Sequence, residues 1–239
     1  METYGLIGKN IDYSFSRNYF SKKFEKESII NSQYINFDID NIINIKKLFK
    51  QKNKGYNVTI PYKEAVIPYL DELDFHAREI GAVNTIKVTN GRTKGFNTDW
   101  IGFKQSLSPF LKSYHNKALI LGTGGASKAV KYVLKQLNIG FATVSRNSAS
   151  LGYEDLSEEL LNEFLIIVNC TPVGTFPNTD EAPGIPYEFI TDRHLAYDLI
   201  YNPEETQFLK ECRLRGAQIK NGLEMLEIQA EEAWKIWNS

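Results

Sequence analysis

The chain has 239 residues, 42% of them hydrophobic and 24% charged, with a formal net charge of −1. That length supports a sizeable core divided between two modest domains. The near-neutral charge argues against a nucleic-acid-binding protein, which usually carries a basic face. Two cysteines and three widely separated histidines give no zinc-binding spacing, so we expect reduced thiols and no metal.

The first residues of the chain and its apolar run at 164–168 predict where in the cell the protein is found. Residues 1–5 lack the basic and long apolar regions of a signal peptide. The apolar run at residues 164–168 is too short to span a bilayer. We therefore expect a cytoplasmic protein with no membrane partner.

Short apolar runs alternate with helical patterns, which predicts an α/β architecture. In the first hundred residues, strands are expected at 4–8 and 33–37, with a turn and helix at 14–24 between them. Asp40 is expected to cap a helix whose apolar positions Ile42, Ile45, Leu48 and Phe49 have helical spacing.

The next segments predict a mixed sheet in the N-terminal half. A strand ends near residues 57–60, and Pro61 follows at a natural first helical position, which puts Lys63 in the opening turn. Two further strands flank Asn90-Gly91, a dipeptide typical of tight hairpins.

A second unit is expected to begin near Tyr114. Its strands are predicted at residues 117–121, 141–144, 165–169, 195–198 and 216–220. The helix after the first of them repeats Val130, Val133, Leu134 and Leu137 on one face. A last helix is expected at residues 223–237.

A glycine-rich turn separates the first strand of this second unit from its helix, with the sequence Gly122-Thr123-Gly124-Gly125-Ala126-Ser127. Glycines let a backbone turn tightly and approach a pyrophosphate, which the helix N-terminus stabilises. Ser127 replaces the third glycine of the usual fingerprint, and a plain structural turn is the alternative. The flanking strand and helix favour a dinucleotide site.

The next strand ends in Ser145-Arg146-Asn147, where an NAD site usually has an acidic residue. A guanidinium suits the 2′-phosphate of NADP because it can form paired, charge-assisted hydrogen bonds. The alternative for Arg146 is a solvated surface charge.

Four polar segments, residues 14–16, 57–63, 81–85 and 95–99, stand where folding alone has little need of them. Ser16 and Asp99 could each be a helix cap, and Asn84 could satisfy a turn. Lys63 differs, because a cation in a first helical turn opposes the macrodipole. Gln229 shares an apolar helical face with Ala230 and therefore either pairs internally or faces a ligand.

Together these segments resemble the shikimate dehydrogenase family, and the match runs in order along the whole chain. The landmarks are Ser14-x-Ser16, Asn57-Val58-Thr59 with Pro61 and Lys63, Gly81-Ala82-Val83-Asn84-Thr85, Asn97-Thr98-Asp99-x-x-Gly102, Gly122-x-Gly124-Gly125-Ala126-Ser127, Asn169-x-Thr171-Pro172-x-Gly174, Tyr197-Asp198-Leu199-Ile200-Tyr201 and Gly222-Leu223-x-Met225-Leu226 with Gln229-Ala230.

The resemblance implies a substrate domain at residues 1–103 and 222–239, with a mixed sheet, and a Rossmann-like, doubly wound cofactor domain at 104–221. It implies reversible, NADP-dependent reduction of 3-dehydroshikimate to shikimate, on the route to chorismate and the aromatic amino acids. The partners expected are this small-molecule substrate and NADP, without nucleic acid, and a homodimer is the assembly considered.

The resemblance also implies roles for individual residues. Lys63 and Asp99 would form the catalytic pair. The substrate would be bound by Ser14, Ser16, Thr59, Lys63, Asn84, Asp99, Tyr201 and Gln229. The cofactor would be bound by Gly122, Gly124, Gly125, Ala126, Ser127, Ser145, Arg146, Thr171 and Gly222.

Two departures from the family concern the cofactor domain. The family often reads Asn-Arg-Thr at positions 145–147, and the stretch from there to Leu165 is shorter than usual. One helix or strand is therefore expected to be trimmed, and the choice between NADP and NAD stays open. The alternatives for function are a quinate/shikimate dehydrogenase with relaxed cofactor use and a catalytically silent NADP-binding regulator.

Overall fold

The computed structural model describes residues 1–12, 14–146 and 151–239, and these form two compact units. Unit 1 contains Met1–Thr98 and Gln229–Ser239, and unit 2 contains Asp99–Ile228. Residues 99–103 and 222–228, which the sequence analysis assigned to the substrate domain, are thus grouped by backbone contacts with unit 2. As a division by function, the expected boundaries stay a prediction.

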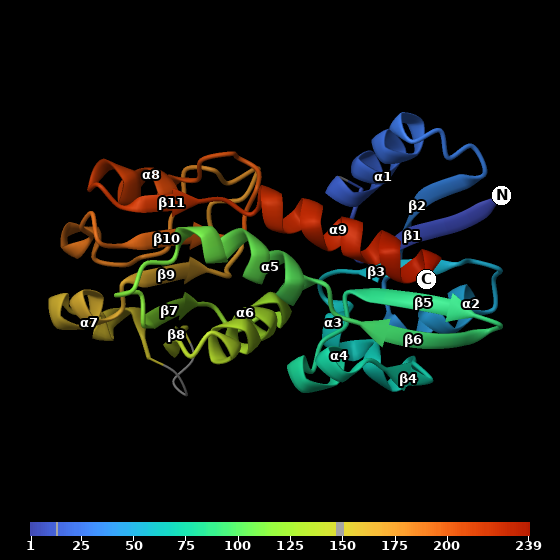
Figure 1. The fold of residues 1–239 in the computed structure, drawn as a ribbon, viewed down its shortest axis with the longest axis horizontal. Helices are drawn as coiled ribbons and strands as arrows, with labels where there is room; N and C mark the ends of the chain where they lie inside the picture. Colours follow the sequence, from blue (N-terminus) through green and yellow to red (C-terminus); the bar gives the residue numbers. More distant parts are fainter. Residues whose placement is uncertain (13, 147–150) are drawn as a thin grey trace. The chain divides into compact units, whose positions relative to one another are not determined.

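Unit 1 is built on a six-stranded mixed sheet, as the hairpin signal predicted (Figure 1). β1 pairs in parallel with β2 and β3, whereas β3–β5 and β5–β6 are antiparallel. In spatial order the strands are β2 (Ser32–Asp38), β1 (Glu2–Gly8), β3 (Gly55–Val58), β5 (Thr85–Thr89), β6 (Arg92–Phe96) and β4 (Glu72–Leu73).

The predicted hairpin is confirmed. Thr89 pairs with Arg92 across the turn, and both Asn90 and Gly91 have positive φ, 53° and 79°. Two such residues in succession are what a tight turn between twisted antiparallel strands requires, and Asn and Gly adopt them at least cost.

The helices of unit 1 are short. They are α1 (Phe15–Lys26), α2 (Ile45–Phe49), α3 (Tyr62–Ala65), α4 (Phe75–Ile80) and the part of α9 (Leu223–Asn238) that begins at Gln229. The expectation that Asp40 caps the second helix is wrong. Asn41 has the extended backbone of a cap, and its side chain accepts a hydrogen bond from Ile43 N at 3.0 Å, opening a 3-10 turn before α2.

The unit 1 sheet is covered on both faces. Successive strand residues point to opposite sides, so Tyr4 and Leu6 of β1 pack in a different cluster from Ile7. The first cluster includes Phe20 of α1 and Trp237 of α9, whose indole donates to Ile86 O at 3.0 Å. This bond and burial fix the last turn of α9 on the sheet.

Unit 2 contains an all-parallel, five-stranded sheet, ordered β11 (Gln218–Lys220), β10 (Leu195–Asp198), β9 (Ile166–Asn169), β7 (Lys117–Leu121) and β8 (Gly140–Val144). Its apolar runs are buried on both faces, as parallel strands require. Ile120 packs with Val130 of α6 (Gly125–Gln136) and Phe103 of α5 (Asp99–Leu107). Leu119 packs with the opposite cluster, beneath α7 (Glu158–Glu163) and α8 (Gln207–Leu214). The doubly wound class is confirmed.

The expected shortening lies beside β8. After the undescribed residues 147–150, Leu151 forms a single parallel bridge with Val144 and accepts a hydrogen bond from Ser145 N at 3.0 Å. In the usual dinucleotide-binding order a further parallel strand occupies this edge. In the described part of this chain, the single bridge takes its place.

The strand order of unit 2 reverses between β7 and β9, because β8 lies on one side of β7 and β9 on the other. At such a switch point the loops after the two strands separate, and ligands bind outside the carboxyl ends. Where these loops leave β7 and β9, one backbone hydrogen bond still joins them, from Cys170 N to Leu121 O at 2.9 Å. Within the described ranges, no helix combines the length and apolar character needed to cross a membrane.

Candidate functional site

The expected substrate-binding residues of unit 1 gather at one edge of its sheet. Thr59 follows the end of β3, and Asn84 precedes the start of β5. Because β3 and β5 are antiparallel, that end and that start are adjacent. Thr98, two residues beyond the end of β6, reaches the same edge, and so does the loop from β1 to Ser14.

The loop that delivers Ser14 is held by polar side chains of β2. The Asp38 carboxylate accepts from Asn10 N at 3.1 Å and from Ile11 N at 3.0 Å, and Asn36 donates to Ile11 O at 2.8 Å. Ser14 then occupies the cap position of α1, but its side chain makes no capping hydrogen bond. Ser16 lies inside the helix, so the interpretation of Ser16 as a cap is wrong.

Asn84 is the centre of a buried group of amides and hydroxyls. Its side-chain oxygen accepts from Thr98 N at 2.7 Å, and its nitrogen donates to Thr98 Oγ1 at 2.9 Å and to Gln229 Oε1 at 3.1 Å. Asn84 is 2% exposed. Gln229 therefore pairs internally through its oxygen, while its Nε2 donates no hydrogen bond within the described residues, so both sequence alternatives remain for that side chain.

A second set of buried polar groups, on β2, β3 and β5, forms hydrogen bonds next to Asn84. Tyr34 donates to Asn57 Oδ1 at 2.8 Å, and Asn57 Nδ2 donates to Thr85 Oγ1 at 3.2 Å and to Asn84 O at 3.3 Å. Burial raises the pKa of Tyr34, against the opposing effect of the Ser16 side chain, so the phenol stays neutral. Sequence reasoning gave Tyr34 no role and treated Asn57 and Thr85 only as landmarks. For Asn57 the signal was a polar residue between Tyr56 and Val58 in a buried strand.

Lys63 lies in α3, which is a single turn of four residues. The helix is held at both ends, since Tyr62 N donates to Thr59 O at 2.9 Å and Val83 N donates to Lys63 O at 2.7 Å. Pro61 occupies the cap position after a cis bond rather than the first helical position. Because one turn has little macrodipole, the electrostatic argument that set Lys63 apart loses its force.

Asp99 and Tyr201 belong to unit 2. Asp99 is the first residue of α5 rather than the residue before the helix, and its side chain is buried, with 5% of the residue exposed. A carboxylate in a first helical turn is favoured by the macrodipole. Tyr201 is half-buried in the segment that follows β10.

The glycine-rich turn joins β7 to α6 as predicted. Gly122 has φ of +101° and donates from its nitrogen to Val144 O at 2.8 Å. A β-carbon there would lie 3.0 Å from the Thr171 methyl, so both backbone conformation and space favour glycine. Gly124 caps α6 and faces open space, and Gly125 and Ala126 begin the helix.

Ser127 has a structural role in this turn. Its hydroxyl donates to Gly124 O at 2.6 Å, and its backbone nitrogen donates to the same oxygen at 3.0 Å. The residue is fully buried. The hydroxyl therefore closes the turn at the position where the usual fingerprint has a third glycine. A direct role of Ser127 in binding a cofactor stays a prediction.

The other expected cofactor residues also lie at the carboxyl edge of the unit 2 sheet. Ser145 is buried and Arg146 exposed directly after β8, while Asn147 lies outside the described residues. Gly222 follows β11 and donates to Ile200 O at 3.0 Å. A β-carbon on Gly222 would meet Leu199 O at 2.2 Å, so close backbone packing requires glycine there.

A buried carboxylate connects the ends of β9 and β10. Asp198 accepts from Asn169 Nδ2 at 3.1 Å, from Ile200 N at 3.0 Å and from Thr206 Oγ1 at 2.6 Å. Burial raises the pKa of Asp198 to about 6, while these three hydrogen bonds act in the opposite direction. Asn169 in turn accepts from Thr171. The sequence marked Asn169 and Asp198 as landmarks but not as a linked pair.

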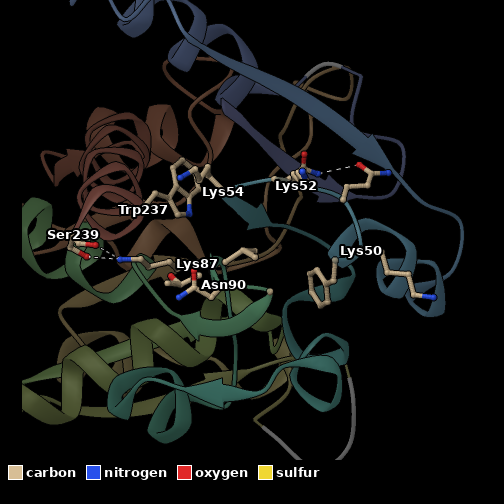
Figure 2. Close-up of a pocket in the computed structure, with 13 residues that line it drawn as sticks. Lys50, Lys52, Lys54, Lys87, Asn90, Trp237 and Ser239 are labelled. Atoms are coloured by element: carbon tan, nitrogen blue, oxygen red, sulfur yellow. Dashed lines mark hydrogen bonds between the residues drawn. The ribbon is translucent and has the colours of Figure 1, made fainter. Parts of the chain in front are cut away.

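Figure 2 shows a separate hollow in unit 1, with a volume of about 470 Å³, lined by Phe49, Lys50, Gln51, Lys52, Asn53, Lys54, Lys87, Val88, Thr89, Asn90, Gly91, Trp237 and Ser239. Lys87 donates to the Ser239 carbonyl, and Lys54 pairs with Glu2 at 3.1 Å. None of the expected site residues lines this hollow. Nor do the described residues contain a cluster of three or more His, Cys, Asp or Glu side chains that could hold a metal ion.

Comparison with known proteins places these observations in a family. Residues 6–86 match the model of the shikimate dehydrogenase substrate binding domain. A Clostridium botulinum protein named shikimate dehydrogenase (NADP(+)) is 41% identical over 250 residues, covering 99% of this chain and 96% of the relative.

Solved structures agree. The Thermus thermophilus shikimate 5-dehydrogenase in complex with NADP(H) and shikimate matches with a TM-score of 0.87 at 30% identity, over 99% of this chain and 93% of that one. A quinate dehydrogenase from Corynebacterium glutamicum in complex with NAD has the same TM-score and coverages but only 25% identity. From its fold, its ordered motifs and these relatives, the chain belongs to the shikimate dehydrogenase family.

Proposed function

We propose that this protein catalyses the reversible, NADP-dependent reduction of 3-dehydroshikimate to shikimate. The observation that carries the proposal is the Asn84–Thr98–Gln229 group at the edge of the unit 1 sheet. A substrate with ring hydroxyls and a carboxylate is recognised best by oriented donors and acceptors, because a mismatched analogue leaves buried polar groups unpaired. Family membership and the glycine-rich turn of unit 2 support the same reaction.

Hydroxyl and amide groups make up most of the proposed substrate contacts. Thr98 fixes the orientation of the Asn84 amide, and a ligand that accepts a hydrogen bond from Asn84 Nδ2 would take the place of Gln229 Oε1. The two donors of Gln229 Nε2 suit a hydroxyl or carboxylate oxygen. The remaining proposed contacts come from Ser14, Ser16, Thr59, Lys63, Asp99 and Tyr201.

Lys63 and Asp99 manage the proton of the reacting hydroxyl. In oxidation, the C–H bond electron pair leaves with the hydrogen as hydride, the O–H bond electrons form the ketone, and the hydroxyl proton passes to this pair. In reduction, protonated Lys63 donates a proton to the ketone oxygen, and Asp99 orients the ammonium. Bound NADP would supply the hydride acceptor or donor.

The nucleotide is assigned to the carboxyl edge of the unit 2 sheet. The N-terminus of α6 and its open Gly124 suit a pyrophosphate, since helix N-termini favour anions and the missing side chain leaves room. Exposed Arg146 suits the 2′-phosphate of NADP. The other proposed contacts are from Gly122, Gly125, Ala126, Ser127, Ser145, Thr171 and Gly222.

Two further parts of the proposal concern the protein's surroundings. We place it in the cytoplasm without a nucleic-acid or membrane partner, and we consider a homodimer. Fluorescence of a tagged protein tests the location, and analytical ultracentrifugation tests the assembly. A membrane-bound signal or a sedimenting monomer would contradict the corresponding part.

The proposed reaction is tested by following nicotinamide reduction with purified protein, offering shikimate or quinate with NADP or NAD. We expect shikimate with NADP to give the largest kcat/KM. A larger value for quinate, or for NAD, would favour the quinate/shikimate dehydrogenase alternative. Tight NADP binding without any turnover of shikimate would instead support the silent regulator.

A further inference from the structure

Asp198 is a fully buried carboxylate at the carboxyl end of β10. Its two oxygens accept three hydrogen bonds, from Asn169, Ile200 N and Thr206. Within residues 1–12, 14–146 and 151–239, no salt bridge neutralises it. A charge buried without a counter-ion is costly unless fixed donors surround it, and here three donors do so.

The first consequence is that Asn169 can adopt one orientation only. A carboxylate only accepts hydrogen bonds, so Asp198 draws the Nδ2 group of Asn169 toward itself. The Asn169 oxygen then faces Thr171, accepting from its backbone nitrogen at 3.0 Å and from its hydroxyl at 2.7 Å. If the Asn169 amide were flipped, its oxygen would face the Asp198 carboxylate, and its Nδ2 donors would face the N–H and hydroxyl donors of Thr171.

The second consequence concerns the glycine-rich turn. Thr171 held in this way places its methyl group against Gly122, where a β-carbon would lie only 3.0 Å away. The Thr171 hydroxyl also accepts from Val173 N at 3.3 Å, which fixes the loop after β9. Three residues thus link the end of β10 to the turn after β7, on both sides of the switch point of the sheet.

The titratable neighbours of Asp198 are neutral near physiological pH. Burial raises the pKa of Cys170 beside β9 and of Tyr197 in β10, and it raises the pKa of Cys212 in α8 to about 12. The pKa of Tyr187, which precedes β10, is raised by the same cause. Among these groups, only Asp198 changes charge in the ordinary pH range.

We propose that Asp198 is a positioning residue for the nucleotide, which sets the shape of the glycine-rich turn through Asn169 and Thr171. The inference rests on the proposed NADP site of unit 2. Ionised Asp198 holds the Asn169 amide most strongly, because hydrogen bonds to a charged acceptor are the stronger ones. Affinity for NADP therefore falls as the pH falls through the range in which Asp198 takes up a proton.

The test uses two substitutions of Asp198 in the full chain. In Asp198→Ala, Asn169 loses its partner and can flip. In Asp198→Asn, the amide oxygen still faces Ile200 N and Asn169, and its nitrogen can donate to Thr206. Leu161→Ala is the matched control, because Leu161 is buried in the same unit but has no bond to these residues.

NADP affinity is measured by calorimetry, and KM and kcat are measured with shikimate, between about pH 5.5 and 8. For Asp198→Ala at about pH 7.5, we expect an NADP affinity about tenfold weaker, with the KM for shikimate and kcat within about twofold, because one oriented hydrogen bond is worth roughly this much. Asp198→Asn should bind within about threefold of the native protein. Its affinity should fall less steeply with decreasing pH than the native affinity, because the 2′-phosphate of NADP still titrates near pH 6 whereas residue 198 no longer does.

The inference is overturned if Asp198→Ala binds NADP as tightly as the native protein, or if Leu161→Ala weakens binding equally. If Asp198→Ala does not fold, the pH profile of Asp198→Asn decides, and a profile that follows the native one overturns the inference. Native protein that binds NADP but does not oxidise shikimate contradicts the proposed function alone. Native protein that does not bind NADP contradicts both.

Discussion

The two units hold their candidate sites in different ways. In unit 1, amides and hydroxyls surround Asn84, and its supporting phenol Tyr34 stays neutral. In unit 2, the turn after β7 depends on a carboxylate, Asp198, with a pKa of about 6. The hydrogen bonds around Asn84 therefore involve only neutral groups, whereas the support of the nucleotide turn includes a group that titrates near pH 6.

Buried histidines extend this contrast, because His115 and His194 both lie in unit 2. Burial lowers the pKa of each, and each ring accepts a backbone N–H at Nδ1. Their contribution to stability is lost as the pH falls below the ordinary value, because the unfolded state then binds more protons. Asp198 has the opposite effect, because its raised pKa makes its contribution to the free energy of unfolding larger at low pH. Acid therefore stabilises unit 2 through Asp198 and destabilises it through the two histidines.

The largest effect is expected at Lys63, which is the unit 1 member of the proposed catalytic pair. Lys63→Ala should lower kcat at least about 100-fold, with a much smaller change in the KM for shikimate, because general acid–base groups contribute about this much. Steady-state kinetics measure both. Lys87→Ala is the matched control, since Lys87 is also in unit 1 and contacts Ser239. Native turnover in Lys63→Ala would remove Lys63 from the mechanism.

Asp198→Asn tests the role of the unit 2 carboxylate through the pH dependence of the free energy of unfolding. The raised pKa means that folded protein keeps this proton up to about pH 6, whereas unfolded protein loses it near 3.8. The native free energy of unfolding therefore falls from about pH 4 to 6 through this group, by up to about 3 kcal/mol. Asparagine does not titrate, so the variant should gain that amount relative to the native protein across this range.

Urea unfolding at several pH values measures this difference. The two histidines are present in both proteins, so their opposite pH dependence cancels in the comparison. A constant difference between the two proteins from about pH 4 to 7 would mean that Asp198 has the same pKa folded and unfolded.

Asn84→Ala probes the neutral network of unit 1. It leaves Thr98 N without its partner and Gln229 Oε1 with the Thr98 hydroxyl alone, so we expect the free energy of unfolding to fall by about 1 to 3 kcal/mol. The KM for shikimate should rise and the NADP affinity should not. Chemical denaturation and calorimetry with NADP provide the two measurements. Loss of NADP affinity with an unchanged KM for shikimate would reverse the assignment of the two units.

Arg146→Ala is expected to have the smallest effect, confined to one nucleotide. Affinity for NADP should fall about tenfold, with that for NAD unchanged, because the guanidinium is assigned to the 2′-phosphate alone. Calorimetry with both nucleotides measures this. Arg193→Ala is the control, since Arg193 stacks on Tyr114 in the same unit. Equal losses for NADP and NAD would place Arg146 elsewhere on the cofactor.

Local patterns made much of the fold predictable. The expected strands at 117–121 and 195–198 coincide with β7 and β10, because short apolar runs are bounded by polar residues there. The hairpin followed from Asn90-Gly91. Caps were less certain, since Asp40 and Asn41 are adjacent and equally suited to the position, and only backbone geometry selects Asn41.

The polar networks could not be predicted in the same way. Asn169 and Asp198 are 29 residues apart, and Asn84 and Gln229 are 145 apart. Their contacts depend on which strands and helices become neighbours, and spacing along the chain does not contain that information. Family resemblance marked most of these residues as landmarks, but their partners follow only from the sheet order.

The most direct test of the whole account is a crystal structure of this protein with shikimate and NADP bound. The account predicts shikimate hydrogen-bonded to Asn84 and Gln229, its reacting hydroxyl in contact with Lys63 and Asp99, and the pyrophosphate at the N-terminus of α6. Shikimate bound away from Asn84, or the pyrophosphate away from the Gly122 turn, would contradict it.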